Sequence, residues 1–478
     1  MPEALWVGEA TGAVALDGAP RFEPRDEMWA VDPAPCLQGV VLADGGARGT
    51  GTATGGDAGD DGGLSLSSVG RLATRAFHGA RHVAGDPRVT GVLRAGPSVA
   101  TFLARSRARR AVASHDSTVV PVRTTPGLAL QAYLDELLIA VFRHPELLPK
   151  EHDYAPAASD VEHLRALFAA RGWLDEPADY HRRPPLPLDV RTEEEHKQGV
   201  TYEHTTFSSG WVPDPLEPGH DRWMGHEANR TVHTWVSRVP GRQQRSWLVC
   251  AHGLGMGNNA MVDLRAFRAA QLVRRGINVA VPVLPLHGPR ASGRGRGEDL
   301  MTIDMVDSMH GVAQATWDVR RLIRWLRDTQ GAEQVGVIGY SLGGLVASLV
   351  ASLEDDLACV IAGIPVVDLP HLFRRHSPPH IARLADTHGL LGTAADDVHR
   401  VVSPLALHCR VPLDRRFIFA GLADRMSTFG HAHRLWLHWD QPALATYAGG
   451  HVGFFWSGAV KRFVDEALSR SYTSRTAT

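Results

Sequence analysis

The sequence contains few cysteines, almost no net charge and no long apolar run, and each of these shortages argues against a class of protein. Only four of the 478 residues are cysteine, and no two of them form a CxxC pair, so we expect neither a disulfide scaffold nor a zinc site built on cysteine. The formal net charge of −2 gives no general attraction for nucleic acid. No run of 18 apolar residues occurs, so we expect no transmembrane helix.

The first residues also lack the pattern of a secretory signal, because no basic segment is followed by a continuous apolar run. Two of the cysteines, Cys250 and Cys359, lie inside apolar runs that are typical of buried strands, where free thiols are expected. Free thiols are consistent with a reducing compartment. We therefore expect a cytoplasmic protein.

The chain is long enough for one large domain and an extension. We expect residues 1–190 to form an N-terminal extension, partly helical and partly disordered, with a flexible segment at 44–63, where almost every residue is Gly, Asp, Thr or Ala. Apolar patterning and flanking Pro and Gly predict helices at 128–142 and 161–170. Residues 191–478, which follow the stiff, proline-rich RRPPLP, form the second and larger predicted domain.

Residues 64–112 have a helical and basic pattern, with four arginines gathered between Arg105 and Arg110. A basic amphipathic segment can lie on an anionic membrane surface, although a solvated helix end is the more common structure with this pattern. The sequence alone leaves both interpretations open.

Beyond residue 200, short apolar runs alternate with helical stretches, which is the pattern of an α/β protein with a doubly wound, mostly parallel sheet. The expected strands are 200–211, 231–239, 247–251, 278–284, 335–338, 358–367, 416–420 and 443–447. The expected helices include 264–275, 303–328 and 458–469. Residues 368–410 are irregular, partly helical and rich in His and Pro, and we expect them to form a lid insertion.

The most informative stretch is Gly339-Tyr340-Ser341-Leu342-Gly343, a G-x-S-x-G motif that lies between an apolar strand and a helix. A strand that turns into a helix within so few residues forces its central residue into a strained backbone conformation, and bulky flanking residues would clash. Such a turn exposes the serine hydroxyl beside a helix N-terminus, whose free N–H groups favour a developing anion. The motif therefore predicts a nucleophilic serine.

A serine hydroxyl needs a base to take its proton, and the base is usually a histidine oriented by a carboxylate. Asp424 follows the expected strand 416–420 directly, and His451 lies between glycines in the loop after strand 443–447. In a doubly wound sheet such residues gather at the carboxyl ends of the strands. The chain order Ser, Asp, His matches this arrangement.

Four pieces of the chain together carry a family resemblance. They are HGLG (252–255), GYSLGG (339–344), GLAD (421–424) and GGHVGFF (449–455). In these pieces, and in their order and spacing, residues from about 200 to 470 resemble the α/β-hydrolase superfamily of the serine esterase and lipase type. The dienelactone-hydrolase and prolyl-oligopeptidase-like branches carry similar motifs, and both stay open. The part before residue 190 resembles no family that we can name.

The resemblance implies a role for each matching residue. Ser341 is the expected nucleophile, His451 the general base and then acid, and Asp424 the carboxylate that orients the histidine. The expected oxyanion hole consists of the backbone N–H of Leu342, which follows the nucleophile, and a second backbone N–H from the turn after His252-Gly253. Leu254 is the expected second donor, and the other residues of the turn up to Met256 stay open for this role. The elbow glycines are Gly339 and Gly343, and no metal or other cofactor is expected.

Some residues offer alternatives to these roles. Asp368 also follows a strand, and some relatives place the acid there. His431, His433 and His438 lie on a probable helix, where surface histidines are a better interpretation than a metal site. His252 is expected to support the oxyanion loop. Arg290, Arg294 and Arg296 lie in a Gly-rich loop that either binds an acidic substrate group or is simply solvated.

The sequence therefore predicts a serine hydrolase that cleaves a carboxylic ester or related acyl bond through an acyl-enzyme intermediate. The expected partner is a small-molecule acyl ester or a lipid-like substrate, with no nucleic acid. An acyltransferase, a membrane-associated lipase and a non-catalytic binding module stay open as alternatives, because one fold and one set of residues serve many activities. The oligomeric state cannot be read from the sequence.

Overall fold

The computed structural model describes residues 41–42, 95–106, 124–142, 149–197, 199–241, 245–291, 297, 300, 302 and 304–472. The predicted flexible segment 44–63 and most of the basic segment 64–112 lie outside the described residues; of the latter, residues 95–106 are helical. Among the described helices, none is both long and apolar enough to span a bilayer.

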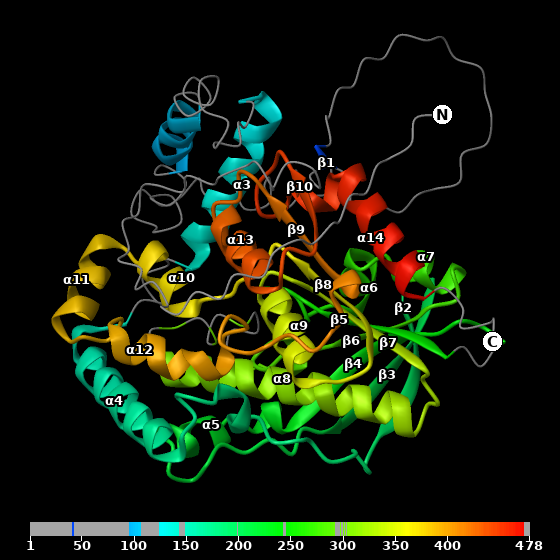
Figure 1. Cartoon of the computed structure of the whole chain (residues 1–478), viewed down its shortest axis with the longest axis horizontal. Coiled ribbons are helices and arrows are strands. Elements are labelled where there is room, and N and C mark those ends of the chain that lie inside the picture. Colours follow the sequence, from blue (N-terminus) through cyan, green and yellow to red (C-terminus); the bar gives the residue numbers. More distant parts are fainter. Residues whose placement is uncertain are drawn as a thin grey trace, which may run out of the picture.

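The architecture is the mostly parallel, doubly covered α/β sheet that the sequence predicts (Figure 1). Its ten strands lie in the order β1-β10-β9-β8-β7-β5-β6-β4-β3-β2, and neighbours from β1 to β6 are parallel whereas β4, β3 and β2 are antiparallel. Their bounds are β1 Val41–Leu42, β2 Arg191–Lys197, β3 Val200–Ser208, β4 Thr231–Ser237, β5 Ser246–Ala251, β6 Asn278–Pro282, β7 Gln334–Tyr340, β8 Leu357–Gly363, β9 Arg416–Gly421 and β10 Ala443–Tyr447.

Helices cover both faces of this sheet. Their bounds are α3 Pro126–Phe142, α4 Tyr154–Arg171, α5 His220–Met224, α6 Ala260–Ala266, α7 Ala269–Arg274, α8 Met305–Asp328, α9 Leu342–Leu353, α10 Leu369–His376, α11 Pro379–Thr387, α12 Thr393–Val398, α13 Thr428–His438 and α14 Gly458–Ser471. Short 3₁₀ turns are η4 Glu151–Asp153, η5 Pro177–Tyr180, η6 Glu227–Arg230, η7 Gly288–Arg290, η9 His399–Val402, η10 Leu413–Arg415 and η11 Gly453–Trp456.

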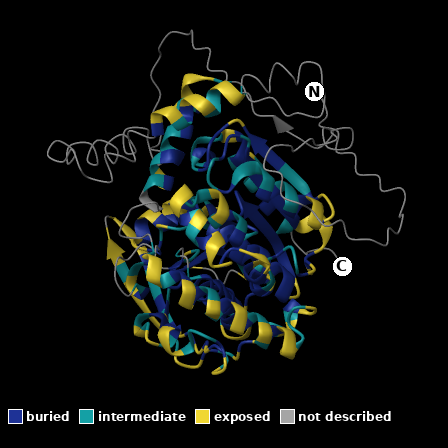
Figure 2. Ribbon diagram, turned by 90° about the vertical axis from the view of Figure 1, so that its left-hand side faces the viewer, coloured by how far each residue is buried: buried dark blue, intermediate teal, exposed yellow. Residues whose placement is uncertain are grey.

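The side chains of β5 show how the sheet divides the core into two layers. Trp247 and Val249 pack into one cluster with α4, α8 and α9, whereas Leu248 and Cys250 pack into the other with α6, α7 and α14. Both faces of the central strands are therefore buried, as the dark interior in Figure 2 shows. Burial on both faces explains why these strands read as continuous apolar runs.

The described helices of residues 124–190 pack against the part of the chain that follows them. The helix expected at 128–142 is α3, and the helix expected at 161–170 is α4, which begins seven residues earlier, at Tyr154, and ends at Gly172 in a left-handed conformation (φ 74°). Helix α4 lies along α8 and α12 (Figure 1). Helix α3 contacts the loops that follow β9 and β10. The insertion expected at 368–410 contains α10, α11 and α12.

The strand β2 was not expected from its sequence, RTEEEHK. It forms the outer edge of the sheet, where it pairs with β3 alone and leaves its side chains mostly exposed. Charged residues are common on such edges because they discourage pairing with another chain. An edge strand of this kind carries little of the apolar signal on which strand prediction depends.

Arg290 is neither solvated nor open to an acidic ligand, so both interpretations of this residue were wrong. Its side chain is fully buried and donates to Asp318 Oδ2 (2.8 Å) and to the backbone oxygens of Val283 (2.8 Å) and Asn229 (2.9 Å). A buried guanidinium is tolerated because these acceptors replace water. Arg294 and Arg296 lie outside the described residues.

We predict that Asp318→Asn lowers the free energy of unfolding by about 3 kcal/mol or more, because it leaves the buried charge of Arg290 without its counter-ion. Urea unfolding followed by tryptophan fluorescence measures this change. The matched control is Asp328→Asn on the same helix, which breaks the exposed pair with Arg324 and should change the free energy by no more than about 0.5 kcal/mol. Equal effects of the two substitutions would contradict the structural role of the Arg290–Asp318 pair.

Candidate active site

The predicted nucleophile lies on the sharp turn between β7 and α9. Ser341 has φ 57° and ψ −113°, a conformation that costs free energy for a residue with a side chain. A Cβ atom at Gly339 would overlap the carbonyl oxygen of Gly343, and one at Gly343 would overlap that of Ala251. The turn therefore accepts only glycine at these two positions, and it leaves Ser341 at the N-terminus of α9.

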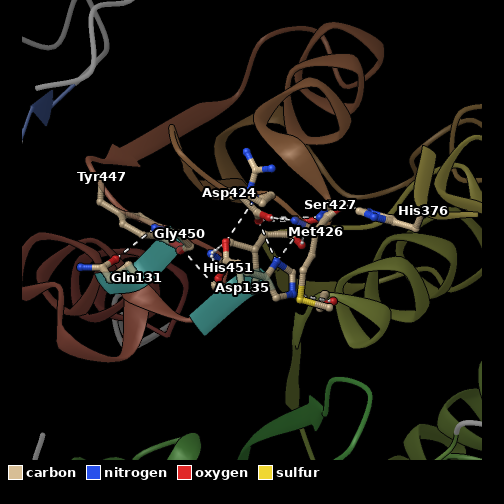
Figure 3. A network of polar contacts seen from close by, with 12 residues as sticks. Gln131, Asp135, His376, Asp424, Met426, Ser427, Tyr447, Gly450 and His451 are labelled. Carbon is tan, nitrogen blue, oxygen red and sulfur yellow. Dashed lines mark hydrogen bonds and ion pairs between the residues drawn. The ribbon is translucent and has the colours of Figure 1, made fainter. Parts of the chain in front are cut away.

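Ser341, His451 and Asp424 form a continuous chain of hydrogen bonds. Nε2 of His451 lies 3.0 Å from Ser341 Oγ. On the other side of the ring, Nδ1 lies 2.7 Å from Asp424 Oδ2 (Figure 3). Because Nδ1 faces a carboxylate, it carries the ring proton, and Nε2 is then the acceptor for the serine hydroxyl. The three residues come from the loops after β9 and β10 and from the turn after β7, which all lie at the carboxyl ends of parallel strands.

The carboxylate of Asp424 is held from several sides. Oδ1 accepts from the backbone N–H groups of Met426 (2.8 Å) and Ser427 (3.1 Å), and the Ser427 hydroxyl lies 3.1 Å from Oδ2. Burial by itself would raise the pKa of Asp424, but the charge of His451 and these hydrogen bonds outweigh burial and hold the pKa below its usual value. Asp424 is therefore ionised when His451 acts.

His451 is also almost fully buried. Burial alone would lower its pKa, yet the negative charge of Asp424, their hydrogen bond and the charge of Asp135 raise the pKa above 6.5. A raised pKa makes His451 a stronger base, provided that the pH is high enough for the ring to be neutral.

The HGLG loop passes directly against the elbow. A Cβ atom at Gly253 would lie 3.2 Å from the carbonyl oxygen of Tyr340 and 3.6 Å from Ser341 Cβ. The ring of His252 holds this loop in place through two contacts. Its Nδ1 lies 2.9 Å from the backbone oxygen of Gly253, and its Nε2 accepts a hydrogen bond from the backbone N–H of Leu284 (3.0 Å). The backbone N–H of Leu254 thus belongs to a fixed loop beside the serine, and that of Leu342 belongs to the first turn of α9.

Sequence reasoning missed a contribution from the N-terminal extension. Asp135 on α3 is fully buried and accepts the backbone N–H groups of His451 (2.8 Å to Oδ2) and Arg425 (3.1 Å). Gln131, one turn earlier, accepts the N–H of Gly450 (3.0 Å; Figure 3). The available signal was a group of three polar residues, Gln131, Asp135 and Glu136, on a helix that is mostly apolar.

The alternative residues belong to a separate polar cluster. Asp368 lies directly before α10, where its carboxylate accepts hydrogen bonds from the backbone N–H of His371 (2.9 Å) and from the side chain of Arg434 (2.9 Å). None of the hydrogen bonds among the described residues joins Asp368 to His451. The expectation of a surface position was wrong for His431, which is buried and accepts the Val367 N–H through Nδ1 (3.2 Å). Burial and the neighbouring His371 lower its pKa to about 3, so it stays neutral.

The chain is similar to known proteins in sequence and in fold. Residues 158–368 match the family described as alpha/beta hydrolase domain containing 18. Uncharacterized protein MT2702 of Mycobacterium tuberculosis strain CDC 1551 is 38% identical over 388 residues, which are 80% of this chain and 92% of that protein. Uncharacterized protein Rv2627c of Mycobacterium tuberculosis strain H37Rv is 37% identical over 388 residues, which again are 80% of this chain and 92% of that protein. Acetyl xylan esterase 1 from Thermoanaerobacterium sp. is 12% identical, with a TM-score of 0.46 over 63% of this chain and 93% of its own.

We predict that Gly343→Ala lowers the free energy of unfolding by about 3 kcal/mol, at the upper end of overpacking costs, because the new methyl group meets backbone atoms that cannot move aside. The control is Gly96→Ala, in the helix at 95–106, where a Cβ atom would meet nothing within 4 Å. That substitution should change the free energy of unfolding by no more than about 1 kcal/mol. Thermal unfolding of both variants separates the two cases, and a fully stable Gly343→Ala protein would contradict the tight packing of the elbow.

Proposed function

Because the chain belongs to the α/β-hydrolase family described as alpha/beta hydrolase domain containing 18, we propose that it is a serine hydrolase that cleaves a carboxylic ester or a related acyl bond. The observation that carries this proposal is the unbroken chain of hydrogen bonds from Ser341 through His451 to Asp424. A side-chain arrangement of this kind allows a neutral serine to lose its proton while it attacks a carbonyl carbon.

In the proposed reaction, Ser341 Oγ attacks the acyl carbon and its proton passes to His451 Nε2. Asp424 stabilises the imidazolium that forms, and it also keeps the proton on Nδ1 before the reaction begins. His451 then donates its new proton to the departing alcohol, which leaves the acyl group on Ser341. Water, deprotonated by the same histidine, releases the acid and restores the serine.

The developing negative charge on the substrate oxygen needs donors that are already in place. The backbone N–H groups of Leu342 and Leu254 fit this role, because one lies in the first turn of α9 and the other in the loop that packs against Ser341. The dipole of α9 adds a favourable field at the same point. Both donors belong to backbone that is fixed by packing, so little reorganisation is required during the reaction.

We predict that Ser341→Ala lowers kcat for hydrolysis of p-nitrophenyl esters by about 10⁴-fold or more, since the nucleophile is lost while the rest of the site remains. A series from short to long acyl chains identifies the acyl group that the site prefers. Ser352→Ala, a buried serine on the same helix, is the control and should keep its activity. Undiminished hydrolysis by Ser341→Ala would refute the proposed nucleophile.

We also predict that kcat/KM falls as the pH is lowered, with a midpoint above pH 6.5, because only the neutral form of His451 can accept the serine proton. The negative charge of Asp424 helps to raise this pKa, so Asp424→Asn should move the midpoint to lower pH and also reduce kcat. Measurement of kcat/KM from about pH 5 to about pH 9 tests both statements. A midpoint well below 6.5 in the wild type would disagree with the arrangement described for His451.

A further inference from the structure

Asp135 joins the two loops that carry the acid and the base of the proposed site. Its carboxylate accepts the backbone N–H of His451 through both oxygens (2.9 and 2.8 Å) and the backbone N–H of Arg425 through Oδ2 (3.1 Å). Arg425 directly follows Asp424. One side chain from the N-terminal extension therefore holds the backbone at His451 and next to Asp424 at the same time (Figure 3).

Other contacts hold α3 in the position from which Asp135 can bind the backbone of both loops. Gln131 accepts the N–H of Gly450, the residue before His451. The guanidinium of Arg425 pairs with Glu136 on α3 and lies over the ring of Phe102, which belongs to the helix at 95–106. Helix α3 is thus docked on the loops after β9 and β10, and the helix at 95–106 contacts the same region through Phe102.

We propose that Asp135 is a positioning residue for the His451–Asp424 pair, and that the N-terminal extension is therefore required to assemble the active site. This inference rests on the proposed function of Ser341, His451 and Asp424. The pair comes from two separate loops, and their 2.7 Å hydrogen bond depends on how those loops lie relative to each other. A carboxylate that binds backbone donors in both loops fixes that relation, whereas side-chain contacts alone would leave the backbone free to shift.

The charge of Asp135 points to a role beyond packing. The titratable groups that face it are Asp424, His451 and the phenol of Tyr447, while the guanidinium of Arg425 is held by Glu136. Burial and the nearby charge of Asp424 raise the pKa of Asp135 from 3.8 to about 7. The negative form of Asp135 in turn helps to raise the pKa of His451.

A raised carboxyl pKa has a definite effect on stability. The folded protein binds the proton of Asp135 more tightly than the unfolded chain does, so this residue makes the free energy of unfolding fall as the pH rises from about 4 to about 7. Above that range the ionised carboxylate is a net cost to the folded state. A residue that costs stability at neutral pH and contacts the backbone of His451 is typical of a functional site.

The test compares Asp135→Asn and Asp135→Ala with the wild type. An asparagine oxygen in the place of Oδ2 can still accept both backbone N–H groups but carries no charge, whereas alanine leaves both donors without an acceptor. We expect kcat for p-nitrophenyl ester hydrolysis to fall about tenfold in Asp135→Asn and about 10²-fold in Asp135→Ala, with a much smaller change in KM. The acid limb of kcat/KM should move to lower pH in Asp135→Asn, because the charge that raises the pKa of His451 is gone.

The control is Glu162→Gln, which removes an exposed carboxylate from α4, where its partner is Arg165, and which leaves the contacts of α3 intact. Its kcat should stay within about twofold of the wild type. At about pH 8, where Asp135 is ionised in the wild type, Asp135→Asn should melt at the same temperature or higher, because the buried charge is removed. Lower activity without lower stability separates positioning from simple support of the fold.

The proposal would be overturned if both Asp135 variants kept the kcat and the pH profile of the wild type. It would also be overturned if Asp135→Asn lost activity only in proportion to a loss of melting temperature and recovered it at lower temperature. These outcomes differ from a failure of the proposed function, in which the wild type itself would show no hydrolysis that depends on Ser341. That last result would remove the basis of both proposals.

Discussion

The proposed chemistry depends on the 2.7 Å hydrogen bond between His451 and Asp424, because it decides which ring nitrogen carries the proton and which one faces Ser341. The two residues lie in loops after β9 and β10, which are parallel neighbours in the sheet, and Ser341 follows β7, two strands away from β9. The parallel sheet brings the loops to one edge, and local contacts then set the final geometry. Backbone donors from Met426 and Ser427 fix the carboxylate, and Asp135 bonds to the backbone of His451.

Several of the buried charged groups have partners of opposite charge. The carboxylate of Asp424 is paired with the imidazole of His451, and the guanidinium of Arg290 is paired with the carboxylate of Asp318. Asp135 is different, since burial and the charge of Asp424 both raise its pKa and together outweigh the lowering by His451 and by the backbone N–H groups. Proteins usually retain such an arrangement where function requires it, because a well-packed apolar side chain would cost the folded state less.

Much of the fold could be predicted from sequence, because the strands that form the centre of the sheet are buried on both faces and are therefore continuously apolar. That Ser341, Asp424 and His451 lie near the carboxyl ends of strands could be predicted as well, since each lies in the turn or loop after an expected strand and glycines occur in each of these turns. Contacts between distant segments could not be predicted from the sequence. Asp135 lies 316 positions from His451, and Arg290 lies 28 positions from Asp318, so neither contact leaves a local pattern. The edge strand β2 escaped prediction because its stability comes from pairing with β3 rather than from apolar side chains.

The central claim is that His451 activates Ser341, and the most direct measurement is to map where a fluorophosphonate reacts with the folded protein. Peptide mass spectrometry after labelling should find the phosphonate on Ser341 and on no other serine, and Asp424→Asn should slow the labelling. Ser427 is an internal comparison, because its hydroxyl lies 3.4 Å from Nδ1 of the same histidine but on the side that faces Asp424. A folded protein that carries no label, or that carries it on Ser427 or elsewhere, would contradict the account.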